Sequence, residues 1–146
     1  MKFNSQEFLI HTIATLIQPS NTIAVGVLSP IPGSAALLSQ QLSKQTKKKV
    51  FILGSNNPKF KTNHGVEIFD LAGQGRIDTF FLSGGQIDGV ANINLTGIGS
   101  YPKQHTRWSG AFGSAYLYFL IPQVILFREK HNREVLVESV DFISAP

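Results

Sequence analysis

Residues 22–53, TIAVGVLSPIPGSAALLSQQLSKQTKKKVFIL, contain two short β-branched or apolar runs on either side of a helix-like segment. We expect a strand at residues 22–27, a helix from residue 35 to about residue 44 that Ser34 caps, and a second strand at residues 50–53. A strand, a helix and a strand in this order form a βαβ unit, whose strands pair in parallel through a right-handed crossover. The chain is therefore predicted to have an α/β fold with an open, mainly parallel sheet flanked by helices.

The segments on either side of this unit extend the same pattern. Asn4 and Ser5 are helix-capping residue types, the apolar side chains after them recur at helical spacing, and Pro19 ends the helix. A third helix is expected at residues 114–120. Further strands are expected at residues 66–71, 77–82, 91–95, 123–127 and 134–140. The length fits one domain that spans residues 1–146.

The composition predicts a soluble globular protein, because 42% of the 146 residues are apolar and 15% are charged. Cysteine is absent, which excludes disulfides, a thiol nucleophile and a thiolate metal site, and no metal site is predicted. We find neither a signal peptide nor an apolar run long enough to span a membrane, so we expect a cytoplasmic protein. The formal charge is only +4 and no nucleic-acid-binding module is recognisable; the lysines at positions 47–49 are expected to be a solvated helix end.

Residues 80–114, FFLSGGQIDGVANINLTGIGSYPKQHTRWSGAFGS, concentrate glycine after a predicted strand. Ligands of open α/β sheets bind where the strands end, and glycine lets the backbone approach a ligand closely. Backbone N–H groups at the start of the helix at residue 114 can hold an anion or an oxyanion. We predict a functional segment here; the alternative is that each glycine only makes a tight turn. The basic loop around His105 either meets phosphate groups or is solvated.

Four segments, in order along the chain, resemble one protein family. Residues 81–101 (FLSGGQIDGVANINLTGIGSY), 106–113 (TRWSGAFG) and 137–146 (VESVDFISAP) are similar to motifs of the B, or β, subunit of family I CoA-transferases of the glutaconate CoA-transferase type. Residues 23–36 resemble that subunit's first strand, glycine turn and helix. The resemblance implies an open α/β sheet, an α-type partner subunit and a hetero- or homo-oligomer.

The resemblance also implies what the protein acts on and which residues bind it. The substrates are coenzyme A, carried as acyl-CoA, and a carboxylic acid, and the resemblance implies no metal. The CoA- or oxyanion-binding residues would be Gly84, Gly85, Gln86, Asp88, Gly110 and Gly113.

The family's catalytic carboxylate is not at its expected place. In the family a glutamate follows the second strand and forms a glutamyl-CoA thioester, whereas the matching position here is Gly54. Ser55 and Glu67 are weak substitutes, since Ser55 suits a turn and Glu67 a solvated surface. Ala91 and Phe112 replace two of the family's glycines, and Phe112 is expected to crowd the ligand site. The family's B subunits continue beyond the segment that ends this chain, so a natural short form or a fragment is expected.

Several functions are compatible with these observations. The first is a β-type subunit that acts on acyl-CoA thioesters with an α-type partner, without the usual glutamyl-CoA nucleophile; an acyl-CoA thioester hydrolase is a variant of it. The second is a non-catalytic structural or regulatory subunit, and the third is a stand-alone binder of an acyl-CoA or nucleotide. Asp88 is expected either to order its loop or to orient a group of the site. No chemistry is assigned to His11, His64 or His131.

Overall fold

The computed structural model describes residues 3–43, 48–62 and 66–146, and the chain divides into two compact units. Unit 1 consists of Met1–Phe81 and Leu120–Ile125, and unit 2 consists of Leu82–Phe119 and Leu126–Pro146. The chain therefore passes from one unit to the other three times. His64 and the lysines at positions 44 and 47 lie outside the described residues.

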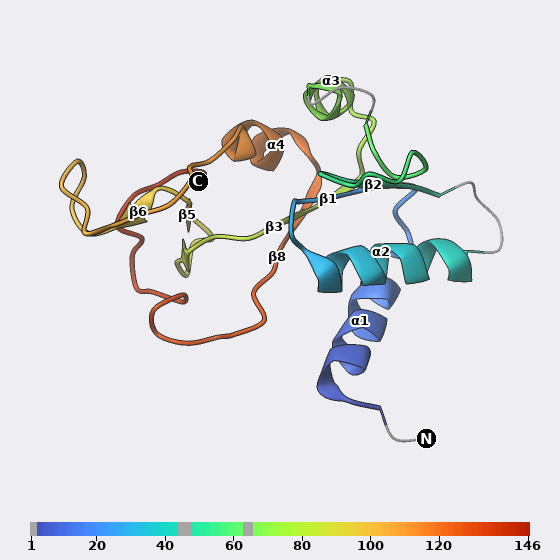
Figure 1. Cartoon of the computed structure of the whole chain (residues 1–146), viewed down its shortest axis with the longest axis horizontal. Helices are drawn as coiled ribbons and strands as arrows, with labels where there is room; N and C mark the ends of the chain where they lie inside the picture. The colour runs from blue at the N-terminus through green and yellow to red at the C-terminus, as the bar shows by residue number, and fades with distance from the viewer. Residues whose placement is uncertain (1–2, 44–47, 63–65) are drawn as a thin grey trace. The chain divides into compact units, whose positions relative to one another are not determined.

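Unit 1 is built on a four-stranded sheet (Figure 1). In spatial order its strands are β2 (Lys49–Ile52), β1 (Thr22–Val25), β3 (Thr79–Leu82) and β8 (Gln123–Leu126). Strand β1 pairs in parallel with both β2 and β3. The Thr79 hydroxyl donates a hydrogen bond to the Gln123 side chain, and the Phe127 N–H donates one to the Leu82 carbonyl. These bonds show that β8 runs in the same direction as β3, which confirms the expected parallel sheet.

Helices cover this sheet. Their bounds are Ser5–Leu16 for α1, Pro30–Leu42 for α2 and Glu67–Gly73 for α3. In Figure 1, α2 and α3 lie on opposite sides of the sheet, and α1 packs against α2. The start of α1 carries a capping box, in which the side chains of Asn4 and Glu7 each accept a hydrogen bond from the other residue's backbone N–H. This confirms the predicted first helix.

The core of unit 1 lies between the helices and the sheet. All four residues of β3 are buried, and three of the four residues of β1 are fully buried. Ala35 and Ala36 of α2 are also fully buried, and their small side chains allow the helix to approach the strands closely. Burial on both faces is the reason why these strands read as continuous apolar runs in the sequence.

Helix α2 begins five residues earlier than expected. Its first residue is Pro30, Ser29 occupies the capping position, and the Gly33 N–H donates to the Ser29 carbonyl at 2.9 Å. Proline is compatible with a first helical turn, because the N–H groups there have no partner within the helix. The expectation that Ser34 caps a helix beginning at residue 35 was therefore wrong.

Two predicted strands are not strands. Residues 66–71 were expected to be extended, but most of them belong to α3, in which Ile68 and Ala72 are buried one turn apart. Short apolar runs do not distinguish a strand from a buried helical turn. At residues 134–140 the N–H groups of Val135 and Leu136 both donate to the Asn132 carbonyl, and only one isolated bridge joins Leu136 to Ile87.

Lys48 corrects the expectation of a solvated lysine run. It directly precedes β2 and exposes only 4% of its surface. Its ammonium group donates to the carbonyls of Ile17 and Gln18 at 3.0 and 2.9 Å, and to the Ser39 hydroxyl at 3.1 Å. All three ammonium protons are thus used, two of them at the carboxyl end of α1, where a cation is favoured.

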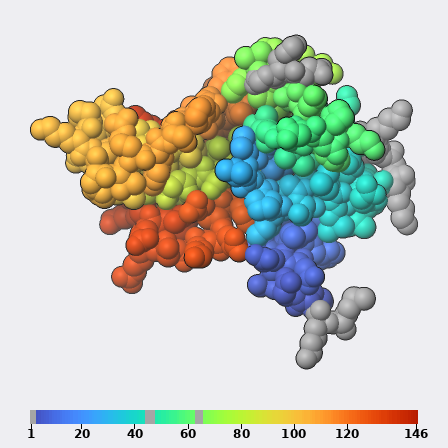
Figure 2. Space-filling view, viewed as in Figure 1, coloured from blue at the N-terminus to red at the C-terminus, as the bar shows by residue number. Residues whose placement is uncertain are grey.

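Unit 2 contains two small antiparallel sheets and one short helix. The helix α4 spans Ser114–Leu120, as expected, and the strand pairs are β4 (Gln86–Ile87) with β5 (Ile93–Asn94), and β6 (Gly97–Ile98) with β7 (Thr106–Arg107). The predicted strand at residues 91–95 is thus reduced to two residues. In Figure 2 the yellow and orange segments that carry β6, β7 and α4 reach the surface. Within the described residues, no helix is long and apolar enough to cross a membrane.

Candidate functional site

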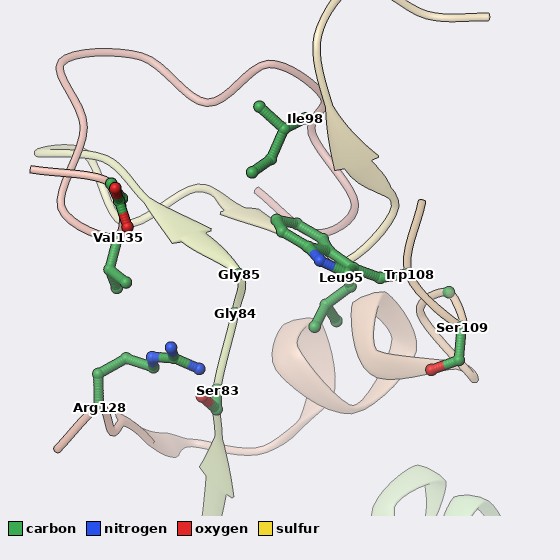
Figure 3. Close-up of a pocket in the computed structure, with 11 residues that line it drawn as sticks. Ser83, Gly84, Gly85, Leu95, Ile98, Trp108, Ser109, Arg128 and Val135 are labelled. Atoms are coloured by element: carbon green, nitrogen blue, oxygen red, sulfur yellow. The ribbon is translucent and has the colours of Figure 1, made fainter. Parts of the chain in front are cut away.

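A pocket of about 430 Å³ lies within unit 2 (Figure 3). Its volume falls within the range of small-molecule sites. Three of its residues, Gly84, Gly85 and Gly110, are among those for which the family resemblance implies ligand binding. The other lining residues are Ser83, Leu95, Ile98, Trp108, Ser109, Arg128, Glu134 and Val135.

Two neighbouring strands bring the polar residues of the pocket together. Ser83 follows the end of β3 and Arg128 lies just beyond β8. Because Leu82 and Phe127 are hydrogen-bonded at 2.9 Å, the two strands end side by side. In Figure 3 the side chain of Arg128 extends toward Ser83 and Gly84. The pocket is therefore lined in part by residues that directly follow two parallel strands, a position at which ligands of open α/β sheets bind.

Trp108 forms one wall of the pocket and depends on a glycine. A β-carbon at position 85 would lie 2.0–2.5 Å from three carbons of the indole ring. Only a residue without a side chain leaves room for the ring there. The Gly85 N–H donates to the Asn94 carbonyl at 2.8 Å, which holds the backbone in place. Gly85 thus leaves the space that the indole ring occupies, and the Gly85 N–H is already hydrogen-bonded.

A buried polar network holds the loops around the pocket. Asn94 is fully buried; its amide donates to the Gln86 side-chain oxygen and to the Gly97 carbonyl, both at 2.7 Å. The same Gln86 oxygen accepts from the Asp141 N–H at 3.0 Å, and the Asp141 carboxylate accepts from the Gln86 amide and the Gly99 N–H. The network joins two segments far apart in the sequence. Gln86 is not among the residues that line the pocket, and its contacts are those of a structural residue.

Asp88 orders the loop after β4. Its carboxylate accepts hydrogen bonds from the backbone N–H groups of Val90 and Asn92 and from the Asn92 amide, at 3.0–3.1 Å. The Asn92 amide is the largest of the influences that lower the pKa of Asp88, and the backbone donors act in the same direction. Asp88 was expected either to order its loop or to orient a group of the site. These contacts are those of a residue that orders its loop.

Two positions at which the chain departs from the family motifs share an unusual backbone conformation. Ala91 has a φ of +68° and Phe112 a φ of +46°, both in the left-handed region that favours glycine. The positive φ at these two positions therefore explains why the family's motifs have glycine there. The Phe112 ring is 79% exposed and does not line the pocket, so the expected crowding of the ligand site is wrong for this pocket. Gly113 follows with a φ of +78° and directly precedes α4.

Unit 1 contains the position expected for the catalytic glutamate. Gly54 follows β2 in a turn and has a φ of +78°, so a side chain there would be strained. The Ser55 hydroxyl accepts a hydrogen bond from the Asn57 N–H at 3.2 Å, as expected of a turn residue. Glu67 begins α3, and its side chain is half-buried. The structure thus places Gly54, Ser55 and Glu67 in unit 1, and the residues with predicted CoA- or oxyanion-binding roles in unit 2.

Sequence reasoning missed Arg128. It follows a predicted apolar strand, and a charged residue at the carboxyl end of a strand is a recognisable signal. The missing information was that β8 lies beside β3, which periodicity alone does not reveal. Among the described residues, no group of three or more His, Cys, Asp or Glu residues could hold a metal ion.

The fold matches several solved structures. The chain aligns over 99% of its length with the decarboxylase AibA/AibB, with a TM-score of 0.81 and 22% identity, and covers 67% of that chain. It aligns over its whole length with IpdAB of Rhodococcus jostii RHA1, with a TM-score of 0.81 and 18% identity, and covers 62% of that chain. For glutaconate coenzyme A-transferase of Acidaminococcus fermentans the TM-score is 0.76 at 17% identity, with 99% of this chain and 63% of that chain covered.

Characterised relatives match about half of the chain. It is 35% identical to the B subunit of 3-oxoadipate CoA-transferase of Pseudomonas knackmussii over 71 residues, which are 49% of this chain and 27% of the relative. It is 29% identical to the B subunit of glutaconate CoA-transferase of Acidaminococcus fermentans over 66 residues, 45% of this chain and 24% of the relative. The matched part thus spans about a quarter of each relative. The family model for coenzyme A transferase matches residues 9–145, nearly the whole sequence, and the chain therefore belongs to the coenzyme A transferase family.

Proposed function

We propose that this chain is the B-type subunit of a complex that acts on acyl-CoA thioesters together with an α-type subunit, without a glutamyl-CoA intermediate at position 54. Family membership and the likeness to two B subunits support the first part. The relatives' names describe subunits and paired chains, which supports an α-type partner. The proposal includes a cytoplasmic location and a single functional domain formed by both units.

The observation that carries the second part is the glycine at position 54. A glutamyl thioester requires a carboxylate that reaches the thioester carbonyl, and Gly54 offers no side chain. Its φ of +78° also makes a side chain unfavourable there. A solved protein of similar fold is a decarboxylase, so the fold supports reactions other than CoA transfer in that protein. We expect Gly54→Glu to destabilise the chain and to leave the family's transfer activity unrestored.

Backbone donors are the proposed contribution of unit 2. The Gly85 N–H is bonded to the Asn94 carbonyl, so the predicted CoA- or oxyanion-binding role falls to Gly84 and Gly110, which line the same pocket. Such donors stabilise the charge that develops on a thioester oxygen during attack. Water or a group of the α-type subunit would supply the nucleophile.

The experiment uses the chain together with the α-type subunit recovered with it from the same cells. The pair is incubated with an acyl-CoA, trapped with hydroxylamine, and analysed by mass spectrometry for any modified residue. Thioester cleavage without a modified residue in this chain is the expected result. A covalent adduct on Glu67 or another carboxylate of this chain would contradict the proposal. Binding of the α-type subunit with no turnover would instead identify a structural or regulatory subunit.

A further inference from the structure

We propose that the outward side of α1 (Ser5–Leu16) forms a twofold, antiparallel contact with the α1 of a second copy of this chain. This inference goes beyond the proposed function, because it concerns the association of two copies and holds whether or not the complex cleaves a thioester. It rests on the exposed side chains of one helix within unit 1.

The two sides of α1 differ in their surroundings. On one side Ile13 and Ala14 are buried, and the helix packs against α2 (Figure 1). The other side is exposed and consists of four residues that spacings of three and four place together on a helix: Phe8, Thr12, Thr15 and Leu16. We call these four residues the α1 face. It is open to a binding partner.

The α1 face lacks the charges that the solvated side of a helix normally carries. Between Glu7 and Lys44 the sequence contains no Asp, Glu, Lys or Arg. The hydroxyls of Thr12 and Thr15 each donate to the carbonyl four residues earlier in the same helix, both at 2.9 Å, so they need no partner outside it. Covering the α1 face therefore removes apolar surface from water and buries no charge.

Large apolar side chains supply most of the surface that such a contact would bury. Phe3 stacks on Phe8 with ring centroids 6.4 Å apart and extends the α1 face at its N-terminal end. Phe3, Phe8 and Leu16 expose 65%, 58% and 55% of their surfaces. With about 150–250 Å² for a whole large side chain, their exposed parts amount to on the order of 350 Å² per copy. Stable complexes bury about 800 Å² per partner, so we expect a reversible dimer and not a permanent one.

The order of the side chains indicates that the occupant is a second copy. Phe8 and Leu16 lie four residues before and four residues after Thr12, so the face reads large, small, large in either direction. A twofold contact requires such self-complementarity, because each contact from one residue to another is repeated in reverse. With the axis beside Thr12, Phe8 of each copy lies opposite Leu16 of the other. A partner with a charged surface would instead leave its charges unpaired.

Sedimentation velocity on the 146-residue chain tests for the dimer. We expect the sedimentation coefficient to rise with concentration. The data should fit an equilibrium between monomer and dimer with a dissociation constant of about 10–100 μM, as suits a small apolar contact.

Charge-swap variants test the antiparallel register. Phe8→Lys and Leu16→Glu each place two unpaired charges in the homodimer, so each should weaken self-association by at least about tenfold. An equimolar mixture of the two variants should associate again. In the mixed dimer the introduced lysine lies opposite the introduced glutamate, and the second pair is unchanged. Val90→Lys introduces a charge at a side chain of unit 2 that is 79% exposed, and this control should associate as the parent does.

Three results would overturn the proposal. They are a parent chain that stays monomeric throughout this range, undiminished association of correctly folded Phe8→Lys and Leu16→Glu variants, and a mixture of the two that remains monomeric. A monomeric parent whose Phe8→Lys variant no longer binds the α-type subunit would assign the α1 face to that subunit instead. Circular dichroism and thermal unfolding establish that each variant is folded. Thioester turnover is measured separately, so either proposal can fail without the other.

Discussion

Gly85 shows how a single missing side chain shapes the pocket. The β-carbon of an alanine there would lie 2.0 Å from a ring carbon of Trp108, so the indole would have to move. We expect Gly85→Ala to destabilise the chain by about 1–3 kcal/mol, as other overpacked sites do. Urea unfolding followed by circular dichroism measures this loss, and Trp108 emission reports the displaced ring.

Gly89 provides the control for that substitution. A β-carbon at position 89 would meet no atom within 4 Å, so Gly89→Ala should change the free energy of unfolding by no more than about 0.5 kcal/mol. If the two alanine variants were equally stable, the packing of Trp108 against Gly85 would not be what requires glycine at position 85.

At Ala91 we expect the opposite effect, namely that exchanging alanine for glycine stabilises the chain. Its φ of +68° disfavours any residue with a β-carbon, so Ala91→Gly should stabilise the chain by about 1 kcal/mol. Ala115→Gly, inside α4, should destabilise it by about 1 kcal/mol, because glycine is unfavourable in a helix. Thermal and urea unfolding compare the two variants. A destabilised Ala91→Gly variant would show that the backbone at position 91 is not strained.

At the scale of elements, Lys48 links α1, α2 and the start of β2. Its ammonium group donates hydrogen bonds to three acceptors, so Lys48→Met would leave two carbonyls and one hydroxyl without that donor. We expect a loss of about 2 kcal/mol in the free energy of unfolding. Lys49→Met, at the exposed neighbouring position, should be nearly neutral. Equal stabilities of the two methionine variants would contradict the role assigned to Lys48.

Lys48 also predicts a pH dependence. Burial lowers the pKa of Lys48 below its ordinary value of 10.5, and the charge of Asp78 opposes this shift. Between the lowered pKa and 10.5, the unfolded chain binds a proton at Lys48 that the folded chain does not, so stability rises with pH in that window. The stability difference between the parent and Lys48→Met should therefore grow in favour of the parent as pH rises toward 10.5. A constant or shrinking difference in urea unfolding would refute this.

The sequence predicted the elements that have unambiguous signals. The cap at Asn4, the β-branched run of β1 and the apolar run of β3 located their elements correctly. The errors concern segments whose sequence patterns are compatible with two different local structures. Pro30 is compatible with both a loop and a first helical turn, and residues 66–71 are too short for periodicity to separate a strand from α3.

The candidate site was predictable only in part, for a related reason. The glycines at positions 84, 85 and 110 were found because a glycine cluster after a strand is a local signal. Arg128 and Glu134 join them through the pairing of distant segments, which no local pattern encodes. Lys48 was misjudged in the same way, since its three acceptors belong to residues 9–31 positions away.

At the scale of the whole molecule, unit 1 is not a continuous stretch of chain. Its edge strand β8 follows residues 82–119, which belong to unit 2. A chain shortened to residues 1–119 would leave the buried strand β3 as an open, apolar edge, so we expect it to aggregate where the 146-residue chain does not. Light scattering at matched concentrations measures this, and a peptide of residues 120–128 added in trans should reduce it. A dispersed, folded fragment would contradict the expectation.

The same arrangement sets an order of events during protein synthesis. Strands β2, β1 and β3 are complete once residue 82 has left the ribosome, yet β8, the second partner of β3, is made about forty residues later. At typical elongation rates of about 5–20 residues per second, β3 remains an unpaired edge for a few seconds. During that interval one edge of β3 (Thr79–Leu82), a strand that is buried in the folded chain, has no hydrogen-bonding partner. The nascent chain is therefore most exposed to chaperones and to neighbouring chains on a polysome just before residues 123–126 are translated.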